Sequence, residues 1–213
     1  MIPLARAAAV LVAASLLLTG CGGGNVPKKA TASPSADDQT EVPVPAGVHL
    51  TDFGTDLKFG QTATVAYEPN EQRNTVLQLT VNSAVKGSIA DLSAYTLEER
   101  TKESTPYYIQ VTVKNIGEGD VGQTPVPLFL VDSSNTLISA SSFTNSFTKC
   151  PSLPLPTTFA PQATLTTCLV YLAPDHGTMT GVSFRAVQEN APILWTGPLT
   201  VPTPPAKTKK KKS

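Results

Sequence analysis

The sequence predicts an all-β fold in which two antiparallel sheets pack face to face. Apolar and polar residues alternate with a period of two along about seven stretches of residues 50–197, as they do in half-buried strands. Turn-forming sequences such as Asn115-Ile-Gly-Glu-Gly separate these stretches. The chain of 213 residues also has 19 prolines and only 15% charged residues, against roughly 25% in an average soluble domain, which disfavours helices.

The alternation is clearest at Leu77, Leu79 and Val81, which are separated by Gln78 and Thr80. The other expected strands are 62–67, 107–114, 128–132, 137–141, 165–172 and 182–187. The single helical candidate, 89–103, has weak periodicity and predicts a loop with one helical turn. We expect one sandwich domain over residues 50–197.

Residues 1–20 are typical of a bacterial secretion signal. Arg6 precedes an apolar run, 7–18, that is shorter than the roughly 20 residues of a membrane-spanning helix. The order Leu18-Thr19-Gly20-Cys21 resembles the lipobox of bacterial lipoproteins, in which the cysteine sulfur is joined to diacylglycerol and the chain is cut just before it. Two acyl chains, at about 0.8 kcal/mol per buried CH₂, anchor a protein stably. An ordinary signal peptide with an incidental cysteine is the alternative.

The composition of residues 21–49 predicts a lipidated Cys21 followed by a disordered tether. Gly, Pro, Ser, Thr, Ala and Val dominate this stretch, so it lacks the apolar surface needed to offset chain entropy. A flexible coil of about 28 residues would hold the domain roughly 30 Å from its anchor and could extend to about 90 Å. Serines and threonines around Pro34 could carry sugars, although a bare linker is the simpler interpretation.

Cys150 and Cys168 remain as a pair if lipid occupies Cys21. In an oxidising compartment two such cysteines usually form a disulfide. A closed loop of 18 residues contributes on the order of 3 kcal/mol to stability in the chain-entropy model. The alternative, a redox-active pair, lacks the Cys-X-X-Cys spacing and the cationic neighbours that lower a thiol pKa.

Patterns that indicate catalysis are absent, and we expect no enzyme, no cofactor and no metal site. The two histidines, His49 and His176, do not form a metal-binding pair, and no Gly-X-Ser-X-Gly elbow or phosphate-binding glycine loop is present. His176 beside Asp175 is more typical of a strand-connecting turn than of a triad. The adjacent Glu98 and Glu99 are typical of a solvated loop.

The charges divide the chain into an acidic body and a basic tail. Residues 50–200 contain eight basic and thirteen acidic side chains, whereas residues 198–213 form a proline-rich stem and a lysine tail. Anionic lipid or wall polymer could attract the tail at up to about 1 kcal/mol per lysine, but a simply solvated tail is the favoured interpretation. The lysines concerned are Lys207, Lys209, Lys210, Lys211 and Lys212. An acidic, exported body makes nucleic acid an unlikely partner.

Four segments resemble the strand signatures of the immunoglobulin-like extracellular antigens and lipoproteins of Gram-positive bacteria, common in actinobacteria. These segments are Gly60-Gln-Thr-Ala-Thr-Val, the stretch from Tyr107 to Gly117, the stretch from Phe159 to Pro174, and Pro192-Ile-Leu-Trp. The resemblance implies an immunoglobulin-like sandwich and an exported location, with no catalytic residues. Where that family often has Pro-Gly-Glu and a following glycine, this chain has Pro161-Gln-Ala and Cys168, which suggests that a disulfide replaces a glycine-shaped strand entry.

Two function classes follow, both for a protein anchored at the extracytoplasmic face of the cell membrane through diacylglycerol on Cys21. The favoured one is a non-enzymatic interaction module that binds a protein or an envelope component. The alternative is an envelope carrier of a lipid or another apolar ligand. A dry sandwich core supports the first class, and a cavity of roughly several hundred Å³ supports the second.

Overall fold

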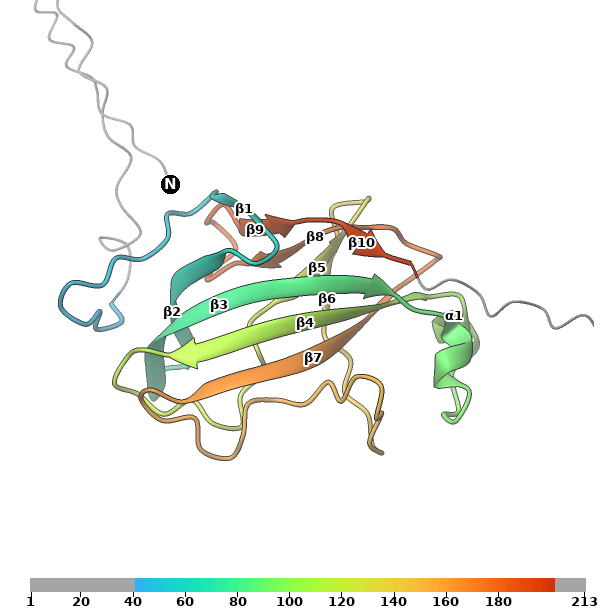
Figure 1. Cartoon of the computed structure of the whole chain (residues 1–213), viewed down its shortest axis with the longest axis horizontal. Coiled ribbons are helices and arrows are strands. Elements are labelled where there is room, and N and C mark those ends of the chain that lie inside the picture. Colours follow the sequence, from blue (N-terminus) through green and yellow to red (C-terminus); the bar gives the residue numbers. More distant parts are fainter. Residues whose placement is uncertain (1–40, 202–213) are drawn as a thin grey trace, which may run out of the picture. The chain divides into compact units, whose positions relative to one another are not determined.

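The computed structural model describes residues 41–201, and the predicted all-β sandwich is confirmed (Figure 1). The short sheet contains, in spatial order, β1 (Asp56–Lys58), β9 (Ile193–Thr196), β8 (Met179–Phe184), β5 (Phe129–Asp132) and β6 (Leu137–Ser139). The long sheet contains β10 (Leu199–Thr200), β3 (Arg73–Lys86), β4 (Thr105–Asn115) and β7 (Thr164–Ala173), with β2 (Thr62–Asn70) also paired to β3. All pairings are antiparallel except β1 with β9 and β10 with β3.

The main core lies between the two sheets and follows from the alternation in the sequence. Leu77, Leu79 and Val81 of β3 are fully buried there, opposite inward-facing residues of β4 such as Val113 and Val111. Trp195 of β9 is also fully buried. Large core side chains keep a hydrogen bond for each polar atom that they bury: the Trp195 indole donates to the Gln61 carbonyl over 2.9 Å, and the Tyr171 hydroxyl donates to the Leu128 carbonyl over 2.9 Å.

A second apolar cluster covers the outer face of the long sheet. Tyr108 and Val170 project there because their neighbours Tyr107 and Tyr171 point into the main core. The cover comes from residues 143–150, which lead into the disulfide, and from residues 89–97, which begin with the short helical turn η2 (Ile89–Leu92). A second turn, α1 (Glu99–Lys102), buries no side chain, and both turns lie inside the expected loop 89–103. The structure joins Cys150 to Cys168, with both sulfurs buried in this cluster. Cys168 lies in the middle of β7 rather than at the strand entry that the family resemblance suggested.

Several boundaries differ from the sequence expectation. Part of the expected tether packs on the domain, because Val42 is buried and Val44 and Val48 are half-buried in a cluster with Leu50 and Val76 on the outer face of β2 and β3. Two short strands, β1 and β10, were not expected, and β10 lies in the expected stem. β9 falls in Pro192-Ile-Leu-Trp, which the family resemblance had given as a strand signature. β8 begins at Met179 and ends at Phe184, so the predicted strand 182–187 extends too far. No helix within residues 41–201 is long and apolar enough to cross a membrane.

Candidate functional site

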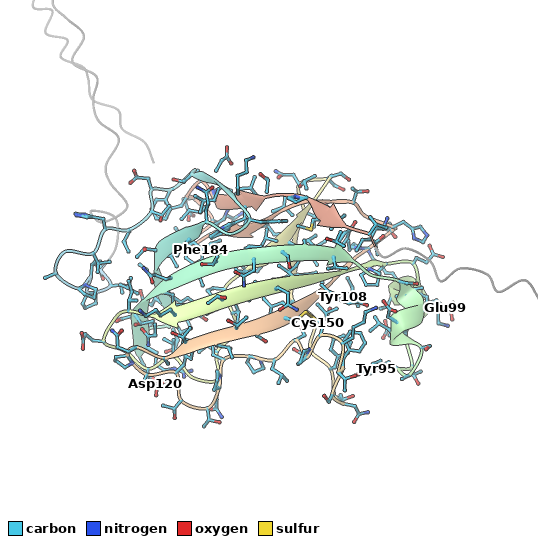
Figure 2. All side chains as sticks on the ribbon, viewed as in Figure 1. Tyr95, Glu99, Tyr108, Asp120, Cys150 and Phe184 are labelled. Carbon is cyan, nitrogen blue, oxygen red and sulfur yellow. A yellow bond between two sulfur atoms is a disulfide. The ribbon has the colours of Figure 1, made fainter. Side chains whose placement is uncertain are left out.

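A cleft of about 820 Å³ lies at the end of the sandwich where β8 ends and β9 begins. The register places Phe129, Ser139 and Phe184 at this same end of the short sheet. Phe184, labelled in Figure 2, lines the cleft together with Leu169 of β7 in the long sheet. Residues 65–68 of β2 form a further part of the lining. Both sheets therefore contribute to one opening.

The floor of the cleft is the edge of the main core, and it is apolar. The residues that form the floor are each at most 3% exposed, and they are Val65, Leu128, Leu169, Phe184 and Ile193. A ligand that enters the cleft thus meets side chains that the fold already holds in fixed positions.

Two exposed apolar side chains stand on the rim. Leu153 is 58% and Val187 is 53% exposed, and both line the cleft. Within residues 41–201, the other large apolar side chains that are exposed are Leu137 and Val201, which are not part of the lining. Single exposed apolar residues are common. Two of them on the rim of one apolar cleft extend the apolar surface from the floor to the solvent.

One wall of the cleft is the segment 123–128, which hydrogen bonds hold in place. The Tyr67 hydroxyl donates to the Pro125 carbonyl over 2.9 Å, and the Arg73 Nη1 donates to the Gly122 carbonyl over 2.7 Å. Asp120 Oδ1 accepts 2.8 Å hydrogen bonds from the backbone amides of Phe159 and Gly122. These two bonds hold the pKa of the Asp120 carboxyl below its usual range.

The start of the disulfide loop lines the cleft beside this segment, because the Leu155 amide donates to the Thr124 carbonyl over 2.9 Å. The Ser152 hydroxyl donates to the Ser141 carbonyl over 2.6 Å and accepts from the Val170 amide over 3.0 Å. The Ser152 amide donates to the Cys168 carbonyl over 2.9 Å. These bonds fix Ser152 to the edge of β7 that β4 does not occupy, close to the Cys150–Cys168 bond. The next residue, Leu153, therefore lies on the rim.

Three charged residues line the cleft: Glu41, Glu68 and Arg185. The two glutamates are exposed, whereas Arg185 is half-buried. The Arg185 Nη1 makes a long hydrogen bond of 3.4 Å to the Gln188 carbonyl. Its Nε is buried and has no hydrogen-bond partner. The cleft therefore combines an apolar floor with one partly desolvated cation.

A separate group of polar residues lies outside the cleft, on the outer face of the long sheet. Asp91 Oδ2 accepts from the Tyr108 hydroxyl over 2.9 Å and lies 2.8 Å from the Lys149 ammonium. Burial of Asp91 opposes ionisation, but the contacts with Lys149, Ser88 and Tyr108 outweigh it and lower the pKa of the carboxyl. Asp91 also forms a capping box with Ser88 at the start of η2. The group thus fastens η2 to the sheet, which is a structural role.

Of the residues that the sequence singled out, those that the structure describes do not line the cleft. Cys21 and the lysines Lys207, Lys209, Lys210, Lys211 and Lys212 lie outside the described residues. Asp175 and His176 sit in the turn between β7 and β8, where the His176 amide donates to the Glu103 carbonyl over 2.7 Å. Glu99 pairs with Lys102 on the exposed turn α1. In residues 41–201, no group of three or more His, Cys, Asp or Glu side chains could hold a metal ion.

The fold and this site define the class of the molecule as an all-β sandwich with an amphipathic cleft at one end. No protein-family model and no curated protein matches the sequence. Among solved structures, the chain is similar to the secreted protein MPT63 of Mycobacterium tuberculosis, with a TM-score of 0.47 and 12% sequence identity. The match covers 68% of this chain and 99% of that one.

Proposed function

We propose that this chain is an exported, lipid-anchored, non-enzymatic protein that binds a small amphipathic ligand, such as a lipid, in the cleft. The observation that carries the proposal is the cleft of about 820 Å³ with a buried apolar floor. Small-molecule sites typically have about 300 to 1,000 Å³ and are mostly apolar with a few polar groups. A dry core would have supported an interaction module, so the cleft favours the carrier that was the alternative from the sequence.

The exported location is supported by the Cys150–Cys168 disulfide, because such bonds persist in oxidising compartments. The chain has three cysteines, so the pairing of these two leaves Cys21 without a cysteine partner in the same chain and available for the proposed lipid. Incorporation of radiolabelled palmitate tests the anchor directly. We expect label on the wild-type chain and none on Cys21→Ala; label that persists in the variant would rule out this site of lipidation.

If Cys21 carries the anchor, the number of residues between it and the cleft limits how far the cleft can lie from the membrane. Glu41 lines the cleft and follows Cys21 by twenty residues. A chain of that length reaches at most about 70 Å, and as a flexible coil it averages roughly 25 Å. With the proposed anchor on Cys21, membrane lipid would be the nearest source of an amphipathic ligand.

Retention of lipid by the purified chain tests the binding function. The chain from residue 22 to residue 213 is incubated with a total lipid extract of bacterial membranes, re-isolated and analysed by mass spectrometry. We expect a reproducible bound lipid. Leu153→Gln should lower retention roughly fivefold, because about 1 kcal/mol of apolar contact is lost at the rim.

Leu137→Gln is the matched control, since Leu137 is also an exposed leucine but does not line the cleft. It should retain as much lipid as the wild type. A wild-type chain that emerges without lipid would refute the carrier function and return the interaction module to first place. Equal losses in both variants would show that binding occurs elsewhere.

A further inference from the structure

We propose that Arg185 is the headgroup receptor of the cleft, so that the preferred ligand is an amphiphile with an anionic headgroup, carboxylate or phosphate. This inference rests on the proposed function and specifies which class of amphiphile the cleft selects. It comes from the position of Arg185, from its unused hydrogen-bond donors and from the absence of a counter-ion beside it within the described residues.

The position of Arg185 is fixed by the strand that precedes it. Phe184 is the last residue of β8 and pairs with Ile193 of β9, and both side chains are buried in the floor of the cleft. Arg185 follows immediately and also lines the cleft. Two residues further along, Val187 stands exposed on the rim. A cation is thus held between the apolar floor and the apolar rim, where the headgroup of a ligand with its tail on the floor would lie.

The hydrogen-bonding capacity of Arg185 is largely unused. A guanidinium has five N–H donors, and for Arg185 the long bond to the Gln188 carbonyl uses one of them. Across residues 41–201, the buried polar side-chain atoms that lack a partner are Arg185 Nε and Ser183 Oγ, both at this end of β8. Buried polar groups without partners are rare in folded proteins, and each calls for an explanation. Because Nε itself is buried, an anion in the cleft would meet the guanidinium through its Nη groups, where the Gln188 carbonyl uses one donor.

The charge of Arg185 also lacks a counter-ion among the described residues. Lys102 pairs with Glu99 and Lys149 pairs with Asp91, and neither pair includes Arg185. A half-buried cation interacts with an anion more strongly than an exposed one does, because less water screens the pair. A guanidinium also fits a carboxylate or phosphate through two parallel hydrogen bonds.

The two glutamates in the lining oppose an anion, but weakly. Glu41 and Glu68 are both exposed, and neither forms an ion pair with Arg185. Water weakens the interactions of exposed charges through its high dielectric constant, and salt screens them further beyond a Debye length of roughly 8 to 10 Å. The half-buried guanidinium therefore dominates the interaction with a headgroup seated beside it.

Three ligands with the same C16 chain test the proposal: hexadecanoate, hexadecanol and hexadecylamine. Each is titrated calorimetrically, below its aggregation concentration at pH 8, into the chain from residue 22 to residue 213. We expect hexadecanoate to bind about 10- to 100-fold more tightly than hexadecanol, since hydrogen bonds to charged groups contribute about 1.5 to 3 kcal/mol. Hexadecylamine should bind most weakly.

Arg185→Gln should abolish the preference for hexadecanoate and leave the affinity for hexadecanol unchanged. Arg185→Lys, which keeps the charge but loses the planar fork, should give an intermediate preference. Arg100→Gln, on the exposed turn α1 away from the cleft, is the matched control and should behave as the wild type. Circular dichroism checks that each variant is folded.

The outcomes separate the two proposals. If hexadecanol and hexadecanoate bind the wild type equally, or if Arg185→Gln weakens both to the same extent, the headgroup role is wrong while the cleft remains a lipid site. If none of the three ligands binds, the carrier function fails, and the role of Arg185 fails with it.

Discussion

Removal of the Cys150–Cys168 bond should lower the free energy of unfolding by about 3 kcal/mol. The bond closes a loop of 18 residues. In the chain-entropy model this loop restricts the unfolded chain by about 11 cal/mol/K, or about 3 kcal/mol at 25 °C. With about 160 ordered residues and roughly 2 cal/mol/K of unfolding entropy per residue, the same loss should lower Tm by about 9 °C.

Two samples separate the cross-link from the packing of the sulfurs. Wild-type protein reduced with a phosphine keeps both sulfur atoms, so its stability change isolates the cross-link. Cys150→Ala with Cys168→Ala also loses buried sulfur contacts, since these residues are 0% and 5% exposed, and should lose about 1 kcal/mol more. Alanine is preferred to serine because a buried hydroxyl would need a partner.

Urea unfolding followed by the fluorescence of Trp195 measures both samples. This side chain is the single tryptophan of the chain and is fully buried, so its emission reports loss of the core. The m-value should rise on reduction, because the unfolded chain without the cross-link exposes more surface. A reduced protein within about 0.5 kcal/mol of the oxidised one would refute the loop-closure argument.

Three further predictions concern the turns that support the sandwich. Asn115→Ala should cost about 3 to 5 kcal/mol in urea unfolding, because the fully buried amide accepts from Thr75 and Gly117 and donates to Gly119 and Phe159, and all four partners would lose a bond. Asp120→Asn should reduce the loss of unfolding free energy at acid pH. Because the pKa of Asp120 is lowered in the folded protein, its stabilising contribution is present above the unfolded pKa near 4 and is lost as the pH falls through the folded pKa. The urea midpoint should therefore fall less in the variant than in the wild type between about pH 6 and pH 2. Gln162→Gly should raise Tm by a few degrees, because Gln162 adopts a φ of 68°, a left-handed conformation that costs a side-chain-bearing residue up to about 1 kcal/mol; an unchanged or lower Tm would contradict that reasoning.

The alternation is clearest in the strands that have one face on the main core over many residues. Leu77, Leu79 and Val81 repeat every second residue because β3 has one face on the main core, and the same is true of β4 and β7. β1 and β10, which the sequence did not predict, are three and two residues long, and parallel pairing with the distant strands β9 and β3 holds them in place. The alternation also continued past Phe184 to Val187, although the strand stops and Val187 is exposed.

Burial on the second face of the long sheet could not be predicted from alternation. Tyr108 occupies a position that a half-buried strand exposes to water, yet it is 4% exposed because η2 and Phe147 cover it. Such cover depends on where loops of distant sequence fold back, which no local pattern encodes. The same holds for the cleft: its lining comes from many separated segments, and Arg185 has no sequence signal that distinguishes it from a solvated surface arginine.

Features that are independent in the sequence meet at the mouth of the cleft, and this has a physical consequence. Three residues that line the cleft come from separate parts of the chain: Glu41 from the N-terminal segment, Leu153 from the disulfide loop, and Arg185 from the end of β8. The Leu153 wall is tied to β7 by Ser152 and by the Cys150–Cys168 bond, so it is ordered before any ligand arrives. Binding to a preorganised wall does not require the entropy loss of ordering it. Reduction of the disulfide should therefore weaken ligand binding even though neither cysteine lines the cleft.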